Sequence, residues 1–169
     1  MTDGRGPLAM GLVIGLGSPD RGDDAVGPAV ARAVAGRMPG VAVVDHEDPT
    51  SLLDLWSGYE PVVVVDAVRS GAEPGTVHHL VTGTDGEPVT TTAWAHTGRG
   101  GTHAMGLAAM VELGRALGRL PARLVVVGVE AESFDHGAPL TARVAAAVPL
   151  AADRVCRDLL ASEAPRGLD

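Results

Sequence analysis

GLVIGLGSPDRGDDAVGP, residues 11–28, joins an apolar run to a helical pattern through a glycine-rich turn and two adjacent acids. The run Leu8–Leu16 is apolar along its whole length, which is typical of a strand buried on both faces. Asp24–Arg37 then repeats apolar residues at helical spacing. This order predicts that Asp23 and Asp24 lie at the carboxyl end of a central strand, the edge at which open α/β sheets bind ligands.

The rest of the chain alternates strands and helices around this unit. Buried strands are predicted at Val41–Val44, Pro61–Asp66 and Arg123–Val129, an antiparallel edge strand at Gly75–Val81, and helices at Thr50–Trp56, His103–Leu117 and Thr141–Leu160. We expect Thr50 or Ser51 to cap the short helix, and Pro149 to break or kink the last helix. The alternation predicts an α/β fold with a parallel-dominated sheet covered on both faces.

The length of 169 residues suits a single domain, 1–169, with its core at about 8–161 and frayed ends at 1–7 and 162–169. One segment, 82–102, is long, polar and glycine-rich and has no sustained period. A loop of this length in a compact domain is usually functional or mobile.

The composition excludes several classes of function. Every one of the 13 basic residues is arginine, which excludes a Walker A lysine and lysine Schiff-base chemistry. A net charge of −8 and 2% aromatic residues argue against nucleic-acid binding. No apolar run approaches the roughly 18 residues of a membrane span, and no secretory signal begins the chain, so a cytoplasmic protein is expected. The lone Cys156 allows no internal disulfide and is expected to be a packing residue.

Three common catalytic or cofactor motifs are also missing. A dinucleotide-binding fingerprint would need glycine where Asp20 stands, and a carboxylate there would repel a pyrophosphate. Pro19 after Ser18 is incompatible with a nucleophile elbow. The triplet His46-Glu47-Asp48 lacks the spacing of a zinc-protease helix.

The candidate functional groups that remain are oxygen and nitrogen ligands near the ends of strands and the beginning of a helix. Asp23 and Asp24 follow the first strand, Asp66 closes the central one, and His103 opens a helix. In a doubly wound sheet these positions share the carboxyl edge, where two carboxylates and an imidazole suit a divalent first-row ion and leave positions open for substrate. A structural alternative stays open: Asp23 or Asp24 caps the first helix, Asp66 caps a turn, and His103 is solvated beside a Thr102 cap.

Three further residues belong to the candidate set. His96 lies seven residues before His103 and is a rival ligand. Glu130 and Glu132 follow the last strand, and they either line the same edge or are solvated loop acids.

Four segments, taken in order, resemble one known family. They are GLGSPDRGDDAVG at 15–27, VVVVDAV at 62–68, GTHAMGLAAMVELGRALGRLP at 101–121 and VVVGVEAESFDHGAPLT at 125–141. Together they resemble the hydrogenase maturation proteases, nickel-dependent endopeptidases that trim the large subunit of NiFe hydrogenases, and the resemblance runs from about Leu12 to Leu160. The chain departs from the family's usual pattern at Ser18-Pro19, where asparagine is common at the first position, and at Ala25, where glycine is common.

The resemblance implies a three-layer α/β/α sandwich around a mostly parallel sheet of about five strands. It implies that Asp24, Asp66 and His103 are metal ligands, that the nickel is supplied by the large-subunit precursor, and that a C-terminal extension is then removed. Another divalent metal is possible in the free enzyme. The resemblance names no general base, and Asp23 is one possibility. Two alternatives are a metal-dependent hydrolase of another peptide or amide on this fold, and a non-enzymatic nickel and precursor docking module.

Overall fold

The computed structural model describes residues 10–84, 86 and 102–161, and for 102–105 it describes the backbone alone. These residues form a five-stranded sheet with the strand order β2-β1-β3-β5-β4. The strands are β1 (Leu12–Leu16), β2 (Ala42–His46), β3 (Val62–Val68), β4 (Val77–Thr82) and β5 (Leu124–Glu130). Strands β2, β1, β3 and β5 are parallel, and β4 runs antiparallel to β5 at the edge. The predicted antiparallel edge strand is therefore confirmed.

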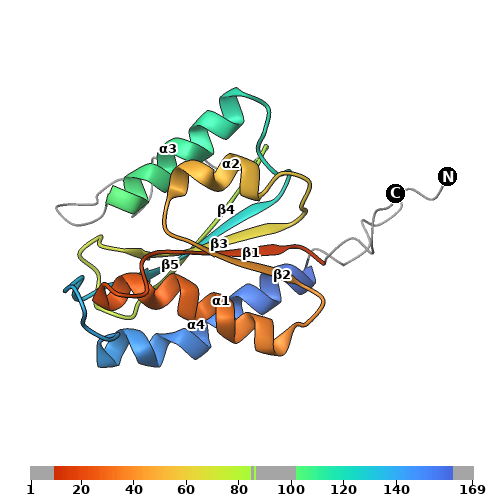
Figure 1. Ribbon diagram of the computed structural model, residues 1–169. Helices are drawn as coiled ribbons and strands as arrows, with labels where there is room; N and C mark the ends of the chain where they lie inside the picture. Colours follow the sequence, from red (N-terminus) through yellow and green to blue (C-terminus); the bar gives the residue numbers. More distant parts are fainter. Residues whose placement is uncertain (1–9, 85, 87–101, 162–169) are drawn as a thin grey trace.

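Helices cover both faces of this sheet. The described helices are α1 (Val26–Arg37), α2 (Leu52–Leu55), α3 (Thr102–Ala116) and α4 (Ala142–Ala161), with the short 3₁₀ turns η1 (Gly22–Ala25) and η2 (Pro49–Ser51). Figure 1 shows α1 and α4 on one side of the sheet and α2 and α3 on the other. The predicted α/β/α layering is confirmed. None of the described helices combines the length and the apolar character that a membrane span requires.

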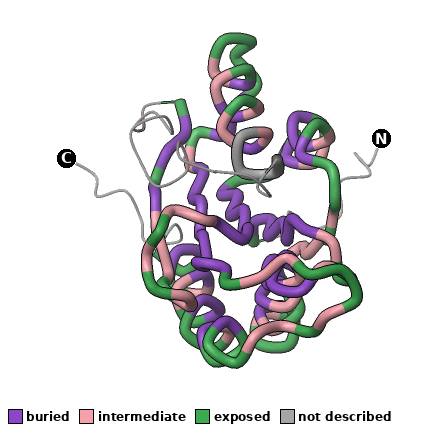
Figure 2. Tube along the Cα trace, turned by 90° about the vertical axis from the view of Figure 1, so that its left-hand side faces the viewer, coloured by how far each residue is buried: buried purple, intermediate pink, exposed green. Residues whose placement is uncertain are grey.

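The sheet separates two apolar cores because neighbouring residues in a strand point to opposite faces. In β3, Val63 and Val65 pack in the core between the sheet and helices α1 and α4. Val62 and Val64 pack in the core on the other face, between the sheet and helices α2 and α3. Every residue of β1, β3 and β5 is buried, and Figure 2 shows this as a continuous buried centre. Continuous valine-rich runs are the sequence signature of strands covered on both faces.

Helix α1 begins almost in contact with the end of β1 and the middle of β3. A Cβ atom on Gly27 would lie 2.1 Å from the backbone oxygen of Leu16 and 2.7 Å from that of Val65. Gly15 faces the same contact, because its Cβ would lie 2.6 Å from the backbone oxygen of Gly27. Glycine at these positions allows the close approach of helix and strand, and it places η1 at the carboxyl edge of the sheet.

Two local predictions, on the cap of α2 and on Pro149 in α4, are wrong in part. Ser51 occupies the predicted N-cap position of α2, but its side chain makes no cap hydrogen bond. The side-chain cap lies at the start of η2, where Asp48 accepts a 2.9 Å hydrogen bond from the backbone N–H of Thr50. The predicted break at Pro149 is wrong because α4 continues to Ala161. The alternative, a kink at Pro149, stays a prediction. Pro149 and Ala145 are both exposed, so the carbonyl group that loses its helical donor lies on the solvent side of α4.

Several predicted segments lie partly or wholly outside the described residues. These are most of the loop at 82–102, which contains His96, and both predicted frayed ends.

Candidate active site

Asp24 lies in η1, directly beyond the carboxyl end of β1. The chain turns back at Gly17, which has φ +132° and approaches Asp24 so closely that a Cβ would lie 2.0 Å from its backbone oxygen. The backbone N–H of Ser18 donates a 2.8 Å hydrogen bond to Oδ2 of Asp24. Asp24 is 5% exposed, so its carboxylate is both oriented and largely shielded from water. The predicted position at the carboxyl edge is confirmed.

Asp66 is a fully buried acid in a strand that is otherwise apolar. The sequence pattern ends the strand at Asp66, but β3 continues to Val68 and Asp66 pairs in register with Gly128 of β5. Its position inside the strand excludes the turn-cap alternative. By strand alternation it shares a face with Val64 and Val68, which pack in the α2–α3 core. Fully buried aspartates are rare in proteins, so Asp66 is a functional candidate.

The third predicted ligand, His103, occupies the second position of α3. Further along α3, Leu107 and Val111 are fully buried in the α2–α3 core. One turn into the helix, a Cβ on Gly106 would lie 2.6 Å from Cγ of Pro49 in η2, which follows β2. The beginning of α3 therefore lies near the carboxyl edge of the sheet.

The fold brings Asp24 and Asp66 to neighbouring elements. η1 contacts β3, and Gly27, three residues beyond Asp24, contacts the backbone of Val65, the residue before Asp66. Among the described side chains there is no group of three or more His, Cys, Asp or Glu residues that could hold a metal ion. The side chain of His103 lies outside that described part of the chain, so the three-ligand set stays a prediction.

The capping alternative is wrong for both acids of η1. The N-cap of α1 is Ala25, and no side chain makes a cap hydrogen bond there. Asp24 instead accepts from Ser18, and Asp23 accepts hydrogen bonds from the loop between β5 and α4. The two neighbouring acids thus point to different parts of the same edge.

Comparisons with known proteins identify the family. A model of the family HycI, described as hydrogenase maturation protease, matches residues 33–158. The chain belongs to the hydrogenase maturation proteases. The matched range contains two of the predicted ligands, Asp66 and His103, and begins after Asp24. A comparison with curated protein sequences found no significant match.

Solved structures of maturation proteases share the fold. The hydrogenase maturating endopeptidase HybD from E. coli superposes with a TM-score of 0.75 at 27% identity, covering 90% of this chain and 93% of HybD. The NiFe hydrogenase maturation protease HybD from Thermococcus kodakarensis gives a TM-score of 0.71 at 27% identity, covering 88% of this chain and 97% of that one. The sheet and both helical layers, with the carboxyl edge that they form, thus make up the fold of the solved hydrogenase maturation proteases.

Serine at position 18 departs from the asparagine that is usual in maturation proteases. The contact with Asp24 is made by the backbone N–H of Ser18. Any residue except proline supplies that donor, so the departure leaves this hydrogen bond intact. Pro19, the next residue, has no backbone N–H to offer, but the contact does not need it.

Glu130 was expected either to line the edge or to be a solvated loop acid, and the solvated alternative is wrong. It is the last residue of β5 and is 1% exposed. Its carboxylate accepts hydrogen bonds from the Ser70 hydroxyl and the backbone N–H groups of Ser70 and Gly71 at 2.8–2.9 Å, and Oε2 lies 3.0 Å from Nε2 of His78. Glu132, in contrast, is exposed.

These contacts stabilise the protein in a way that is lost in acid, when Glu130 becomes protonated. Burial alone would raise the pKa of the Glu130 carboxyl, but the hydrogen bonds from Ser70, His78 and Gly71 outweigh it and hold this pKa below its ordinary value of 4.5. A lowered pKa contributes stability above about pH 4.5 that is lost as the pH falls through the folded-state pKa.

Glu130→Gln is therefore expected to reduce the free energy of unfolding at pH 7 by about 1–3 kcal/mol, because an amide replaces an acceptor that faces several donors. It should also flatten the loss of stability below about pH 4.5. Urea unfolding at a series of pH values measures both effects, with the exposed Glu132→Gln as the matched control. An acid limb that is identical in Glu130→Gln and the unmutated protein would contradict this assignment.

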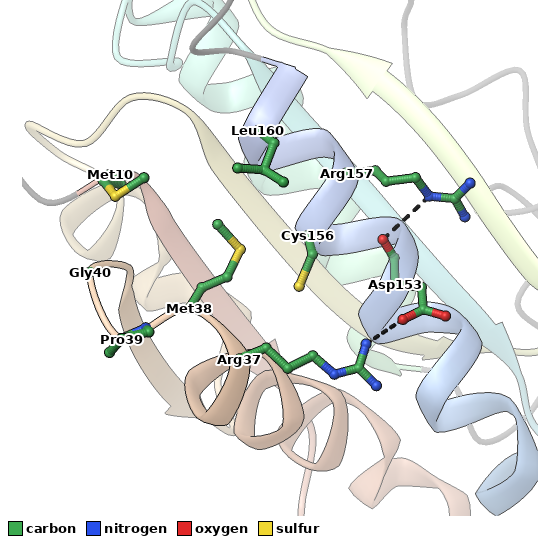
Figure 3. A pocket seen from close by; sticks show the side chains of 9 residues that line it. All are labelled: Met10, Arg37, Met38, Pro39, Gly40, Asp153, Cys156, Arg157 and Leu160. Carbon is green, nitrogen blue, oxygen red and sulfur yellow. Dashed lines mark hydrogen bonds and ion pairs between the residues drawn. The ribbon is translucent and has the colours of Figure 1, made fainter.

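One cavity of this maturation protease lies away from the acidic edge. It has a volume of about 850 Å³ and lies at the amino ends of β1 and β2. Its lining includes Met10 before β1, Met38 and Pro39 between α1 and β2, and Leu160 near the end of α4. Figure 3 shows Cys156 of α4 beside Met38 in this cavity. Cys156 is a free thiol of intermediate exposure that packs against the α1–α4 core, so the predicted packing role is confirmed.

Proposed function

We propose that this maturation protease removes a C-terminal extension from the large-subunit precursor of a NiFe hydrogenase after nickel has been inserted. The observation that supports this proposal best is the pair of shielded carboxylates, Asp24 and Asp66, on neighbouring elements at the carboxyl edge of the sheet. The proposal adds His103, at the start of α3, as the third ligand.

The donor set fits nickel that arrives with the precursor as part of the substrate. Two carboxylates and an imidazole are ligands that first-row divalent ions accept, and three protein ligands leave coordination positions for groups of the precursor. The same set would also accept another divalent ion in the free enzyme. A bound divalent ion supplies Lewis-acid chemistry, which polarises a peptide carbonyl group.

The residues of the chain then have distinct tasks in this proposal. The N–H of Ser18 orients the carboxylate of Asp24 before the precursor arrives. Asp66 offers its carboxylate from β3, the central strand of the sheet. Such preorganisation fixes the bound nickel, and with it the neighbouring peptide bond, relative to the protein.

The test is to mix the purified protein with a nickel-loaded large-subunit precursor and to measure the intact mass of the precursor. We expect loss of one discrete C-terminal fragment. A nickel-free precursor is the control for metal recognition, and it should keep its full mass.

Other outcomes favour the alternatives. An unchanged mass together with stable binding of a verified cognate precursor would support a docking module. Equal cleavage of the nickel-free precursor would overturn the nickel-guided reaction and favour a hydrolase that carries its own metal.

A further inference from the structure

Asp23 is an extensively hydrogen-bonded carboxylate at the acidic edge. It is fully buried, and its Oδ2 accepts from the backbone N–H groups of Glu132 and Ser133 at 2.9 and 3.0 Å. Its Oδ1 accepts from the backbone N–H of Thr141 at 2.7 Å, and the hydroxyl of Thr141 lies 3.0 and 2.9 Å from the two oxygens. All of these donors belong to the loop between β5 and α4.

These contacts use the acceptor capacity of the carboxylate. An ionised carboxylate has about four lone-pair sites. Three backbone N–H groups and one hydroxyl group already occupy them in Asp23. A general base needs a free lone pair within hydrogen-bond reach of the proton that it abstracts. Asp23 therefore lacks the geometry of a base, although its position in the sequence made it a candidate.

Backbone hydrogen bonds join the same two segments of the chain on both sides of Asp23. The N–H of Gly22 donates to the oxygen of Ala138 at 3.0 Å, and the N–H of Asp23 donates to the oxygen of Ser133 at 2.9 Å. From the other side, the N–H of Gly137 donates to the oxygen of Asp20 at 2.6 Å. The turn that carries Asp24 and the 131–141 loop thus form one hydrogen-bonded unit.

We propose that Asp23 is a positioning residue of this site: its carboxylate clamps η1 to the 131–141 loop and thereby fixes its neighbour Asp24 for the metal of the precursor. This inference rests on the proposed function for its effect on the reaction. The clamp itself rests only on the contacts of Asp23. A side chain held between two loops 109–118 residues apart in sequence restricts both at once.

The proposal predicts a specific kinetic pattern. If Asp24 binds the nickel of the precursor in both the ground state and the transition state, a misplaced Asp24 weakens binding uniformly and raises KM. Asp23→Asn is expected to raise KM by about 10–100-fold, the usual effect of removing a group that orients a ligand, while kcat changes by less than about threefold. Loss of a general base would instead lower kcat by about 10²–10⁴-fold at unchanged KM.

Variants of Thr141 test the same contact if Asp23→Asn folds poorly. Thr141→Val removes only the hydroxyl donor and should raise KM in the same direction by a smaller factor, whereas Thr141→Ser retains the hydroxyl and should restore the original value. In the double variant Asp23→Asn, Thr141→Val, the effects on KM should be less than additive, because both changes disrupt one set of contacts.

Amide hydrogen exchange tests the clamp without any cleavage assay. In Asp23→Asn, the amides of Glu132, Ser133 and Thr141 should exchange faster, while those of the central strand β3 keep their protection. Unchanged exchange at these three amides would overturn the clamp, and a fall in kcat at constant KM would overturn the positioning role. If the unmutated protein leaves a verified precursor intact, the proposed function fails, whereas the exchange data still decide the clamp.

Discussion

Asp66→Asn is expected to reduce the cleavage rate of the nickel-loaded precursor by about a hundredfold or more. Substitutions of groups that merely orient a metal ligand already cost about 10–100-fold, and Asp66 is proposed as a ligand itself. Asparagine has nearly the same shape, and it replaces the carboxylate of a fully buried residue in an apolar strand. We therefore expect Asp66→Asn to fold like the unmutated protein, so that the loss of rate reports on the site.

Rates from intact-mass time courses, together with thermal unfolding by circular dichroism, measure these two effects. The matched control is Asp54→Asn, which changes an exposed aspartate on α2 and should leave the rate unchanged. The double variant Asp24→Asn, Asp66→Asn should be hardly slower than either single variant, because the two ligands act as a unit. Retention of most of the activity in Asp66→Asn would remove Asp66 from the ligand set.

The second large effect concerns the close contact between α1 and the sheet. Gly27→Ala is expected to lower the free energy of unfolding by about 3 kcal/mol or more, since the new methyl group would overlap the backbone oxygens of Leu16 and Val65 at 2.1 and 2.7 Å. Backbone atoms in two buried strands have little freedom to move away. Relief of the overlap would push the start of α1, and with it η1 and Asp24, away from the sheet.

Gly36→Ala in the same helix provides the control. A Cβ atom at Gly36 would have no neighbour within 4 Å. Alanine there should stabilise the protein by about 0.5–1 kcal/mol through its higher helix propensity. Urea denaturation of both variants measures the difference. If Gly27→Ala were as stable as the unmutated protein, the proposed reason for glycine at position 27 would be wrong.

The sheet was largely predictable because its strands carry a strong local signal. The valine-rich runs at β3 and β5 are apolar without interruption, and burial on both faces is the usual explanation of such runs. The boundaries were less accurate. The predicted strand ends at Asp66, where the run of valines stops, but β3 extends two residues beyond it.

The candidate site was predictable in part. The positions of Asp24 and Asp66 at the carboxyl edge follow from strand order, which the alternation of strands and helices indicates. The role of Asp23 did not follow, because its partners lie 109–118 residues away. Glu130 was left undecided for the same reason, since its contacts with His78 and Ser70 span 52 and 60 residues.

The sequence by itself determined the layered architecture, the edge at which the acids lie and the resemblance to a protease family. These depend on apolar runs, glycine spacing and short motifs, all of which are local. The tertiary structure alone decided which acid is oriented by Ser18, which acid clamps the 131–141 loop, and that Glu130 is buried. A carboxylate has the same intrinsic chemistry at all three positions, and its role is set by the hydrogen-bond donors that distant parts of the chain bring to it.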